Sequence, residues 1–214
     1  MIEAISTAWQ NLARPEGAAI AAVAVDAADG PMPPVIRSSA PRRRATFLAG
    51  RRAARLALSR AGFAGHAVLG IGADGLPLWP QGWRGSISHT DDIALAIAAP
   101  AQAVAILGLD LERMIAPELA EAIAPTIMPE YRAESGMSLA HEITRVFSGK
   151  EALYKALFPQ CRQFREFSAA RAWWQKGDLH LALSEDWHDD WPENTSFQIR
   201  QTLAAGHVLS LLWY

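Results

Sequence analysis

The sequence predicts an α+β fold in which two similar halves pack side by side, each with one long helix and several strands. Two helical patterns carry this prediction. One opens after Pro41, and the other covers about 138–158 with apolar residues at three- and four-residue spacing. Short apolar or alternating runs, bounded by glycine and proline, surround both helices and are typical of strands. We expect a ligand to bind where the halves meet.

The expected elements follow one another in a simple order. The first half has a strand near 18–25, the helix after Pro41, a turn at 74–80, and strands near 68–72, 85–89 and 93–98. The second half has a strand at 104–112, helices near 117–124, 129–134 and 138–158, and strands near 179–183, 196–203 and 208–213. We therefore divide the chain into subdomains 1–103 and 104–214.

Composition narrows the class of protein. The chain has 214 residues, is 50% hydrophobic and carries a net charge of −2, so it has ample material for a core and is not an overall basic nucleic-acid binder. No apolar run approaches the roughly 20 residues of a membrane span, and the first residues lack the basic region of a secretory signal. Cys161 is the single cysteine, which excludes an internal disulfide. We expect a cytoplasmic protein.

An acidic pair lies on the strand that opens the second half. The two-residue period of a strand puts Asp110 and Glu112 on one face, while Leu107, Leu109 and Leu111 take the other. One face then belongs to the core, and the other offers two carboxylates. Such oxygens are ligands for a hard divalent cation.

The second long helix adds a further acid and two lysines. Lys150 falls inside the apolar stripe, where an ammonium must snorkel or pair with an anion, and Glu151 and Lys155 lie at the edge of the stripe. Together with Asp110 and Glu112, these residues predict a site for a divalent cation and a phosphorylated substrate. An ordinary helical Glu–Lys pair and two surface acids are the alternative.

Magnesium is the metal that this ligand set favours. Carboxylates without clustered histidines or cysteines suit a hard cation that shares itself with substrate phosphates. The six histidines form no zinc-binding spacing, and one cysteine cannot build a thiolate site.

Arginines crowd the first long helix. Arg51 lies within its apolar face, with Arg44 and Arg55 alongside. Neighbouring guanidinium groups repel one another unless an anion lies between them, and their fork geometry suits phosphate oxygens. A phosphate-binding helix and a solvated cationic face are both compatible with this pattern.

A serine and a histidine end the strand near 85–89. Ser88 and His89 are adjacent, so they point to opposite faces of a strand, which argues against a nucleophile pair. They can instead offer hydroxyl and imidazole donors to a phosphate, although a lone histidine is often structural.

Four of these segments match one family in order and spacing. The chain resembles the 4′-phosphopantetheinyl transferases of the larger, pseudo-dimeric class, of the enterobactin synthetase component D type. The resemblance covers residues 44–167, and its four blocks are FLAGRRAARLAL at 47–58, GLPLWP through GSISH at 75–89, GLDLE at 108–112 and FSGKEALYK at 147–155.

The resemblance implies a fold, an activity and a partner. The two halves would be related by pseudo-two-fold symmetry, and a monomer would build the whole site. The enzyme would move the phosphopantetheine arm of coenzyme A (CoA) to a serine of an apo carrier protein and release adenosine 3′,5′-bisphosphate. The enterobactin type indicates a carrier of siderophore or other secondary-metabolite biosynthesis.

The resemblance also implies residue roles. Asp110, Glu112 and Glu151 would hold Mg²⁺, or Mn²⁺, on the CoA pyrophosphate, and Glu151 would act as base directly or through a water. The other implied contacts are with CoA: Lys150 and Lys155 at the phosphates or the leaving bisphosphate, Ser88 and His89 at the phosphates, and Arg44, Arg51 and Arg52 at the adenosine 3′-phosphate.

Some features depart from the family pattern or leave alternatives open. Leu76 stands where many relatives carry a lysine, and Gly149 interrupts the second long helix, where it can allow close packing. A Mg²⁺-dependent nucleotide phosphohydrolase and a non-catalytic CoA- or anion-binding module are the rival functions. The candidate carrier-docking residues are Met128, Arg132, Met137, Arg145, Phe158 and Arg162.

Overall fold

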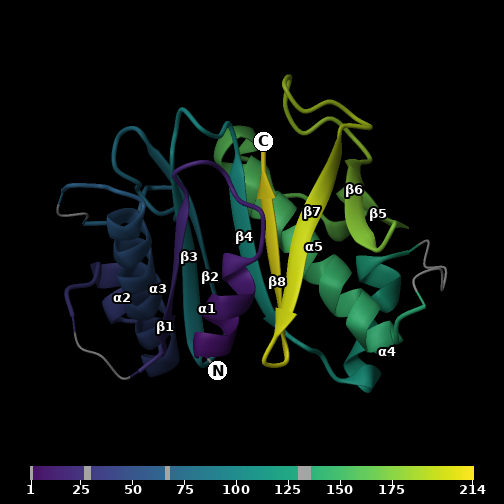
Figure 1. Ribbon diagram of the computed structural model, residues 1–214, viewed down its shortest axis with the longest axis horizontal. Coiled ribbons are helices and arrows are strands. Elements are labelled where there is room, and N and C mark those ends of the chain that lie inside the picture. Colours follow the sequence, from purple (N-terminus) through teal and green to yellow (C-terminus); the bar gives the residue numbers. More distant parts are fainter. Residues whose placement is uncertain (1, 27–29, 66–67, 130–135) are drawn as a thin grey trace.

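Two antiparallel sheets stand side by side in the computed structural model, which describes residues 2–26, 30–65, 68–129 and 136–214 (Figure 1). The first sheet has the order β1-β3-β2, and the second has the order β4-β8-β7-β6-β5. The strands of the first are β1 (Ala19–Ala24), β2 (Trp83–His89) and β3 (Ile93–Pro100). Those of the second are β4 (Leu107–Arg113), β5 (Ala170–Gln175), β6 (Asp178–Leu183), β7 (Ser196–Ala204) and β8 (His207–Trp213).

Each sheet carries one long helix on the same side. Helix α3 (Pro41–Arg60) packs on the first sheet, and α5 (Leu139–Cys161) packs on the second, beside α4 (Pro117–Ile127). Helix α1 (Ile2–Gln10) lies against the opposite side and contacts strands of both sheets. The short helices α2 (Pro34–Arg37) and η1 (Phe167–Ala169) complete the fold.

Alternation along the strands builds separate cores on the two sides. On β3, Ala94, Ala96 and Ala98 face α3, whereas Ile93 and Leu95 join the core beneath α1. The small alanines allow α3 to approach the sheet closely. The core beneath α1 also includes leucines of β4 and β8, so the two halves share apolar packing.

Both ends of helix α5 have a capping residue. The Ser138 hydroxyl caps it by accepting the His141 N–H at 3.4 Å, and Arg162 ends it in the left-handed conformation with φ 56°. Gly149 lies against the sheet, where an added Cβ would come within 2.5 Å of Leu179 Cδ2. The close packing expected of Gly149 is therefore confirmed.

Gly108 allows α5 to lie directly on β4. A Cβ at this position would meet the carbonyl oxygen of Ala152 at 1.9 Å and the backbone nitrogen of Ala156 at 2.7 Å. Only a residue without a side chain permits this approach. The glycine of the GLDLE segment thus brings the lysine-bearing helix next to the acidic strand.

Most predicted elements are confirmed, and the differences have local causes. Residues 68–72 form no strand among the described residues, only a single bridge between Ile71 and Pro77. The carbonyls of Leu69 and Gly70 both accept hydrogen bonds from the Arg51 side chain. The Gly70 carbonyl also accepts the Leu78 N–H, so this segment bonds to the turn that follows it instead of to a strand. Helix α1 and strand β5 were not predicted, and the helix predicted at 129–134 lies largely outside the described residues.

The expectation of a helix and a sheet in each half is confirmed, with three strands in the first and five in the second. The boundary predicted at 103/104 falls between β3 and β4. The pseudo-two-fold relation and the division into subdomains stay predictions. In the described ranges, every helix is too short or too polar to cross a lipid bilayer.

Candidate functional site

The predicted site lies at the seam where the edge strands β2 and β4 meet beneath α5. Lys155 Nζ lies 2.6 Å from Asp110 Oδ1 and donates to Ser88 Oγ at 3.0 Å. The Ser88 hydroxyl in turn donates to Asp110 Oδ1 at 2.9 Å. Three elements that are distant in sequence thus bring a carboxylate, an ammonium and a hydroxyl together.

Asp110 is almost completely buried, as its place on the helix-facing side of β4 requires. Leu107, Leu109 and Leu111 point into the core beneath α1, so the predicted alternation is confirmed. A buried carboxylate needs compensation for its charge. Lys155 supplies it on one oxygen, while Oδ2 has no hydrogen-bond partner among the described residues.

Glu112 and Glu151 complete an acidic neighbourhood around Asp110. Burial, and secondarily the negative charge of Asp110, raise the pKa of Glu112 to about 7. Burial also raises the pKa of Glu151, an effect that Lys155 opposes and Asp110 strengthens. The three carboxylates therefore lie close enough for the charge of one to raise the pKa of another.

This donor set fits a hard divalent cation. The unpartnered Oδ2 of Asp110 and the raised pKa values of its neighbours are features that a bound cation would relieve. In the described ranges, however, no three His, Cys, Asp or Glu side chains converge closely enough to enclose a metal ion. Asp110, Glu112 and Glu151 are therefore candidate ligands that do not enclose a metal ion in this arrangement.

Lys150 lies away from this cluster. Its ammonium donates to the carbonyls of Ile127 and Phe167, both at 2.7 Å, and burial lowers its pKa to about 8. These bonds tie the end of α4 and η1 to α5. The contact with CoA phosphate stays a prediction, and the observed contacts of Lys150 are structural.

The three predicted phosphate-binding arginines each have protein partners. Arg44 donates to the Ser39 carbonyl at 2.7 Å, and Arg52 pairs with Asp26 at 3.3 Å. Arg51 is buried over the Phe47 ring, and this burial lowers its pKa to about 10. Their roles at CoA also stay predictions.

Arg43 is a residue that the sequence reasoning did not single out. Partial burial of Arg51 and His89 is the main cause that lowers the pKa of each, and the positive charge of Arg43 lowers both further. Arg43 therefore lies near both groups. Lys155 acts on His89 in the same direction. Arg43 and Lys155 thus make the surroundings of His89 electropositive. Spacing along α3 could have suggested Arg43, because it precedes Arg51 by about two helical turns.

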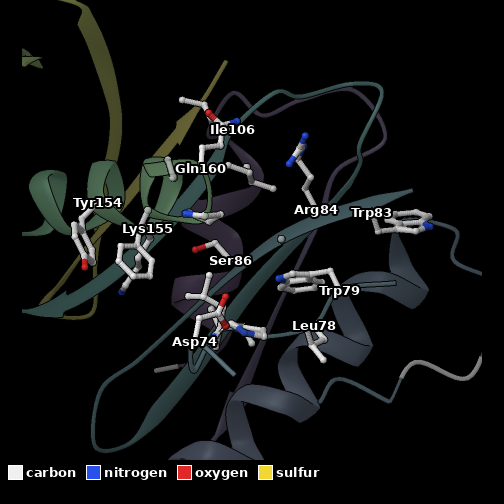
Figure 2. Close-up of a pocket in the computed structure, with 18 of the residues that line it drawn as sticks. Asp74, Leu78, Trp79, Trp83, Arg84, Ser86, Ile106, Tyr154, Lys155 and Gln160 are labelled. Carbon is white, nitrogen blue, oxygen red and sulfur yellow. Dashed lines mark hydrogen bonds between the residues drawn. The ribbon is translucent and has the colours of Figure 1, made fainter. Parts of the chain in front are cut away.

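A cavity of about 370 Å³ opens along the seam (Figure 2). Trp79, Trp83 and Tyr154 supply aromatic walls, and Lys155 connects the cavity to the acidic cluster. Trp79 can lie against β2 because Gly85 has no side chain. A Cβ at this position would meet the Trp79 ring at 2.3 Å. The cavity can hold a flat, partly apolar group beside an anion site.

Leu76 also lines this cavity, so the position without a lysine lies at the predicted site. The loop that carries Leu76 is tied across the seam by an ion pair between Asp74 and Arg162. Arg162, which caps the C-terminal end of α5, thus brings a cation of the second half to this loop.

The candidate docking residues that the structure describes differ in exposure and in their partners. Met128 is buried, Phe158 is half-buried, and Arg162 is paired with Asp74. Arg145 donates to Gln201 Oε1 at 2.9 Å and to the Met137 sulfur at 3.2 Å. Arg132 lies outside the described residues.

Several known proteins are similar in sequence to this chain. Enterobactin synthase component D of Salmonella typhi is 38% identical over 125 residues, which are 56% of this chain and 51% of the relative. The 4′-phosphopantetheinyl transferase Npt of Nocardia iowensis is 29% identical over 194 residues, 84% of this chain and 86% of the relative. PptT of Mycobacterium tuberculosis, another 4′-phosphopantetheinyl transferase, is 32% identical over 158 residues, 72% and 64% respectively.

The chain spans about half the length of the enterobactin synthase relative. A model of the 4′-phosphopantetheinyl transferase N-terminal domain matches residues 32–99, which include α3, β2 and the start of the seam. A model of the 4′-phosphopantetheinyl transferase superfamily matches residues 106–205, which include β4 and α5. With both long helices and the seam between them matched, the chain belongs to the 4′-phosphopantetheinyl transferase superfamily.

Proposed function

We propose that this protein transfers the 4′-phosphopantetheine group of CoA to a serine hydroxyl of an apo carrier protein. In this reaction the serine oxygen bonds to the phosphorus that carries pantetheine, and the bond from that phosphorus to the bridging oxygen breaks. The leaving group is adenosine 3′,5′-bisphosphate. The observation that carries the proposal is the contact of Lys155 with Asp110 and Ser88 at a seam that also holds Glu112 and Glu151.

Asp110, Glu112 and Glu151 would hold Mg²⁺, with Mn²⁺ as a substitute. When bound, such an ion neutralises negative charge on the pyrophosphate and orients it for in-line attack. The unpartnered Oδ2 of Asp110 supports this assignment, because it is a buried acceptor next to two further carboxylates. The metal dependence belongs to the proposal.

Lys155 would stabilise charge that develops on the leaving oxygen. Its ammonium is partly exposed and anchored on Asp110, so it is held ready at the seam. A cation that is already oriented does not have to reorganise during the reaction. Ser88 and His89 would add donors to the phosphates from the end of β2.

Glu151 would accept the proton of the carrier serine. A serine hydroxyl is a weak nucleophile near neutral pH and needs a base. Burial raises the pKa of Glu151, which brings its basicity closer to the working pH. The proton passes to its carboxylate directly or through a water.

The seam cavity would take the nucleotide end of CoA. Its aromatic walls suit a flat ring, and Lys155 stands at its inner edge. Arg43, which has no hydrogen-bond or ion-pair acceptor among the described residues, would then meet phosphate together with His89. The name of the enterobactin synthase relatives favours a carrier domain of siderophore biosynthesis.

Intact mass spectrometry of an apo peptidyl carrier protein tests the proposal. We expect a gain of one phosphopantetheine group after incubation with this protein, CoA and Mg²⁺, and no gain in EDTA. Restoring Mg²⁺ or Mn²⁺ to the EDTA sample should restore the gain. Glu118→Gln is a matched control for Glu151→Gln, because Glu118 is an exposed carboxylate on α4.

The same samples separate the rival functions. Loss of intact CoA without any gain on the carrier identifies a nucleotide phosphohydrolase. CoA binding without turnover, in the presence of several carriers, identifies a binding module. Either result contradicts the transferase proposal.

A further inference from the structure

Side chains, rather than a backbone ladder, join β2 to β4. These are the facing edge strands of the two sheets (Figure 1), and the described residues contain no strand pairing between them. The bonds across the seam come from every second residue of β2. They are Arg84 Nε to the carbonyl of Val104, just before β4, at 3.0 Å, Ser86 with Leu109, and Ser88 with Leu111 and Asp110.

Ser86 holds the backbone of Leu109 at both of its polar groups. Its hydroxyl accepts the Leu109 N–H at 3.0 Å and donates weakly to the Leu109 carbonyl at 3.5 Å. A hydroxyl has one donor and two acceptor sites, so it can serve both groups at once. Ser86 is 6% exposed, and therefore water does not readily replace it.

Ser88 repeats the contact two residues further on. Its hydroxyl accepts the Leu111 N–H at 3.2 Å. Because Ser86 meets Leu109 and Ser88 meets Leu111, the two strands advance in the same direction and in one register. A slip of one residue would turn the leucines toward α5 and Asp110 toward the core beneath α1.

Asp110 lies between the two backbone positions that these serines hold. Ser88 also contacts the Asp110 carboxylate and Lys155, so it is part of the site itself. Ser86 contacts neither group, although it lines the seam cavity near Lys155 (Figure 2). We propose that Ser86 is a positioning residue, whose bonds to Leu109 fix β4 against β2 and so deliver the Asp110 carboxylate to Lys155 and to a divalent cation.

This inference rests on the proposed function for its consequence, since the cation site belongs to that proposal. Its geometric basis is separate. Loss of the Ser86 hydroxyl leaves the Leu109 N–H buried without an acceptor, and β4 can recover one only by moving along or away from β2. A displacement of even about 1 Å in a site of this kind can cost about a hundredfold in rate.

The test compares Ser86→Ala with Ser210→Ala. Ser210 is a matched control, because it is a buried serine on β8 directly opposite Asp110, but its bonds go to Ser148 and Gln201 instead of across the seam. The measurements are the Mn²⁺ dissociation constant by electron paramagnetic resonance without CoA or carrier, amide hydrogen exchange at Leu109 and Leu111, and the melting temperature.

For Ser86→Ala we expect faster exchange at both amides and Mn²⁺ binding weakened about tenfold, because the ligand oxygen is misplaced. Ser86→Thr keeps the hydroxyl and should restore the affinity. Ser210→Ala should lower the melting temperature and leave the Mn²⁺ affinity within about twofold of the wild type, since it leaves the seam intact.

Wild-type Mn²⁺ affinity in Ser86→Ala, with a melting temperature lowered as in Ser210→Ala, overturns the inference. If Ser86→Ala does not fold, Ser86→Cys replaces it. The thiol forms weaker hydrogen bonds than a hydroxyl, so Ser86→Cys should bind Mn²⁺ more weakly than Ser86→Thr. A Mn²⁺ affinity equal to that of the wild type would again contradict the inference.

Failure of the proposed function has a different signature. In that case the wild-type protein neither binds Mn²⁺ nor modifies a carrier. Amide exchange then still decides the role of Ser86: faster exchange at Leu111 as well as Leu109 in Ser86→Ala supports the register role, and unchanged exchange at Leu111 refutes it.

Discussion

The ammonium of Lys155 lies 2.6 Å from Oδ1 of Asp110, so a helix of the second half and the edge strand beside it share one charge pair. The Asp110 side chain is 1% exposed and that of Lys155 is 28% exposed. The lysine can therefore reach a ligand while it compensates the carboxylate. This pair joins α5 to β4 and places one positive and one negative charge at the seam.

Asp110→Asn should abolish most activity without unfolding the protein. The amide keeps the shape of the carboxylate but removes its charge, and the partly exposed Lys155 can turn to solvent. We expect transfer to fall by at least about a hundredfold, the scale of losing one electrostatic group in an active site. Carrier mass gain measures activity, and circular dichroism checks the fold. Full activity in this variant would refute the assignment of the acidic site.

The two lysines of α5 should differ in their effect on the transfer rate. Lys150→Met leaves the carbonyls of Ile127 and Phe167 without a donor, and we expect the free energy of unfolding to fall by about 2 kcal/mol or more. The folded Lys150→Met variant should keep a transfer rate closer to that of the wild type, because the observed contacts of Lys150 are structural. Lys155→Met should lower the transfer rate and should also lower stability, because the buried Asp110 carboxylate loses its counter-charge. Urea unfolding and carrier modification of both variants give the comparison, and equal transfer rates in the two folded variants would contradict it.

Stability of the metal-free protein should depend on Glu112 between pH 4.5 and 7. Burial raises the folded pKa of this carboxyl to about 7, above its ordinary 4.5, so the folded state binds the proton more tightly than the unfolded state does. The contribution is complete below pH 4.5 and is lost as pH rises through 7. We measure melting temperatures from pH 4.5 to 8 in EDTA. The melting temperature of the wild type should fall more steeply with rising pH than that of Glu112→Gln, which cannot titrate at this position.

Magnesium should act against this trend. A cation favours the ionised carboxyl, so it should raise the melting temperature of the wild type more at pH 8 than at pH 5. An effect of Mg²⁺ that does not depend on pH, or that persists unchanged in Glu112→Gln, would remove Glu112 from the ligand set.

Gly108→Ala should be strongly destabilising. Its Cβ would fall 1.9 Å from the Ala152 carbonyl oxygen, so α5 would have to move away from β4. We expect a loss of about 3 kcal/mol, at the upper end for an overpacked core. Gly70→Ala is the control, because the nearest atom to its added Cβ lies 3.5 Å away and belongs to the flexible end of Leu78. Comparable losses in both variants would disprove the close-approach explanation.

The local patterns of this sequence were sufficient for most elements and for part of the site. Periodicity located α3 and α5, and alternation assigned Asp110 to the face opposite Leu109. These predictions succeeded because burial on one side of a helix or strand leaves a regular spacing in the sequence. The pairing of the acidic strand with the lysine helix was also expected, and the contact between Asp110 and Lys155 bears it out.

Partners across elements were decided only by the tertiary structure. The family resemblance gave Lys150 and Lys155 the same expected role at CoA, but their partners differ: Lys150 meets the carbonyls of α4 and η1, whereas Lys155 meets Asp110 and Ser88 at the seam. Likewise, nothing local distinguishes Ser86 from a surface serine, because its partner Leu109 belongs to another sheet. Sequence patterns record which face of an element is buried, whereas the identity of a buried polar group's partner depends on how elements far apart in the chain pack together.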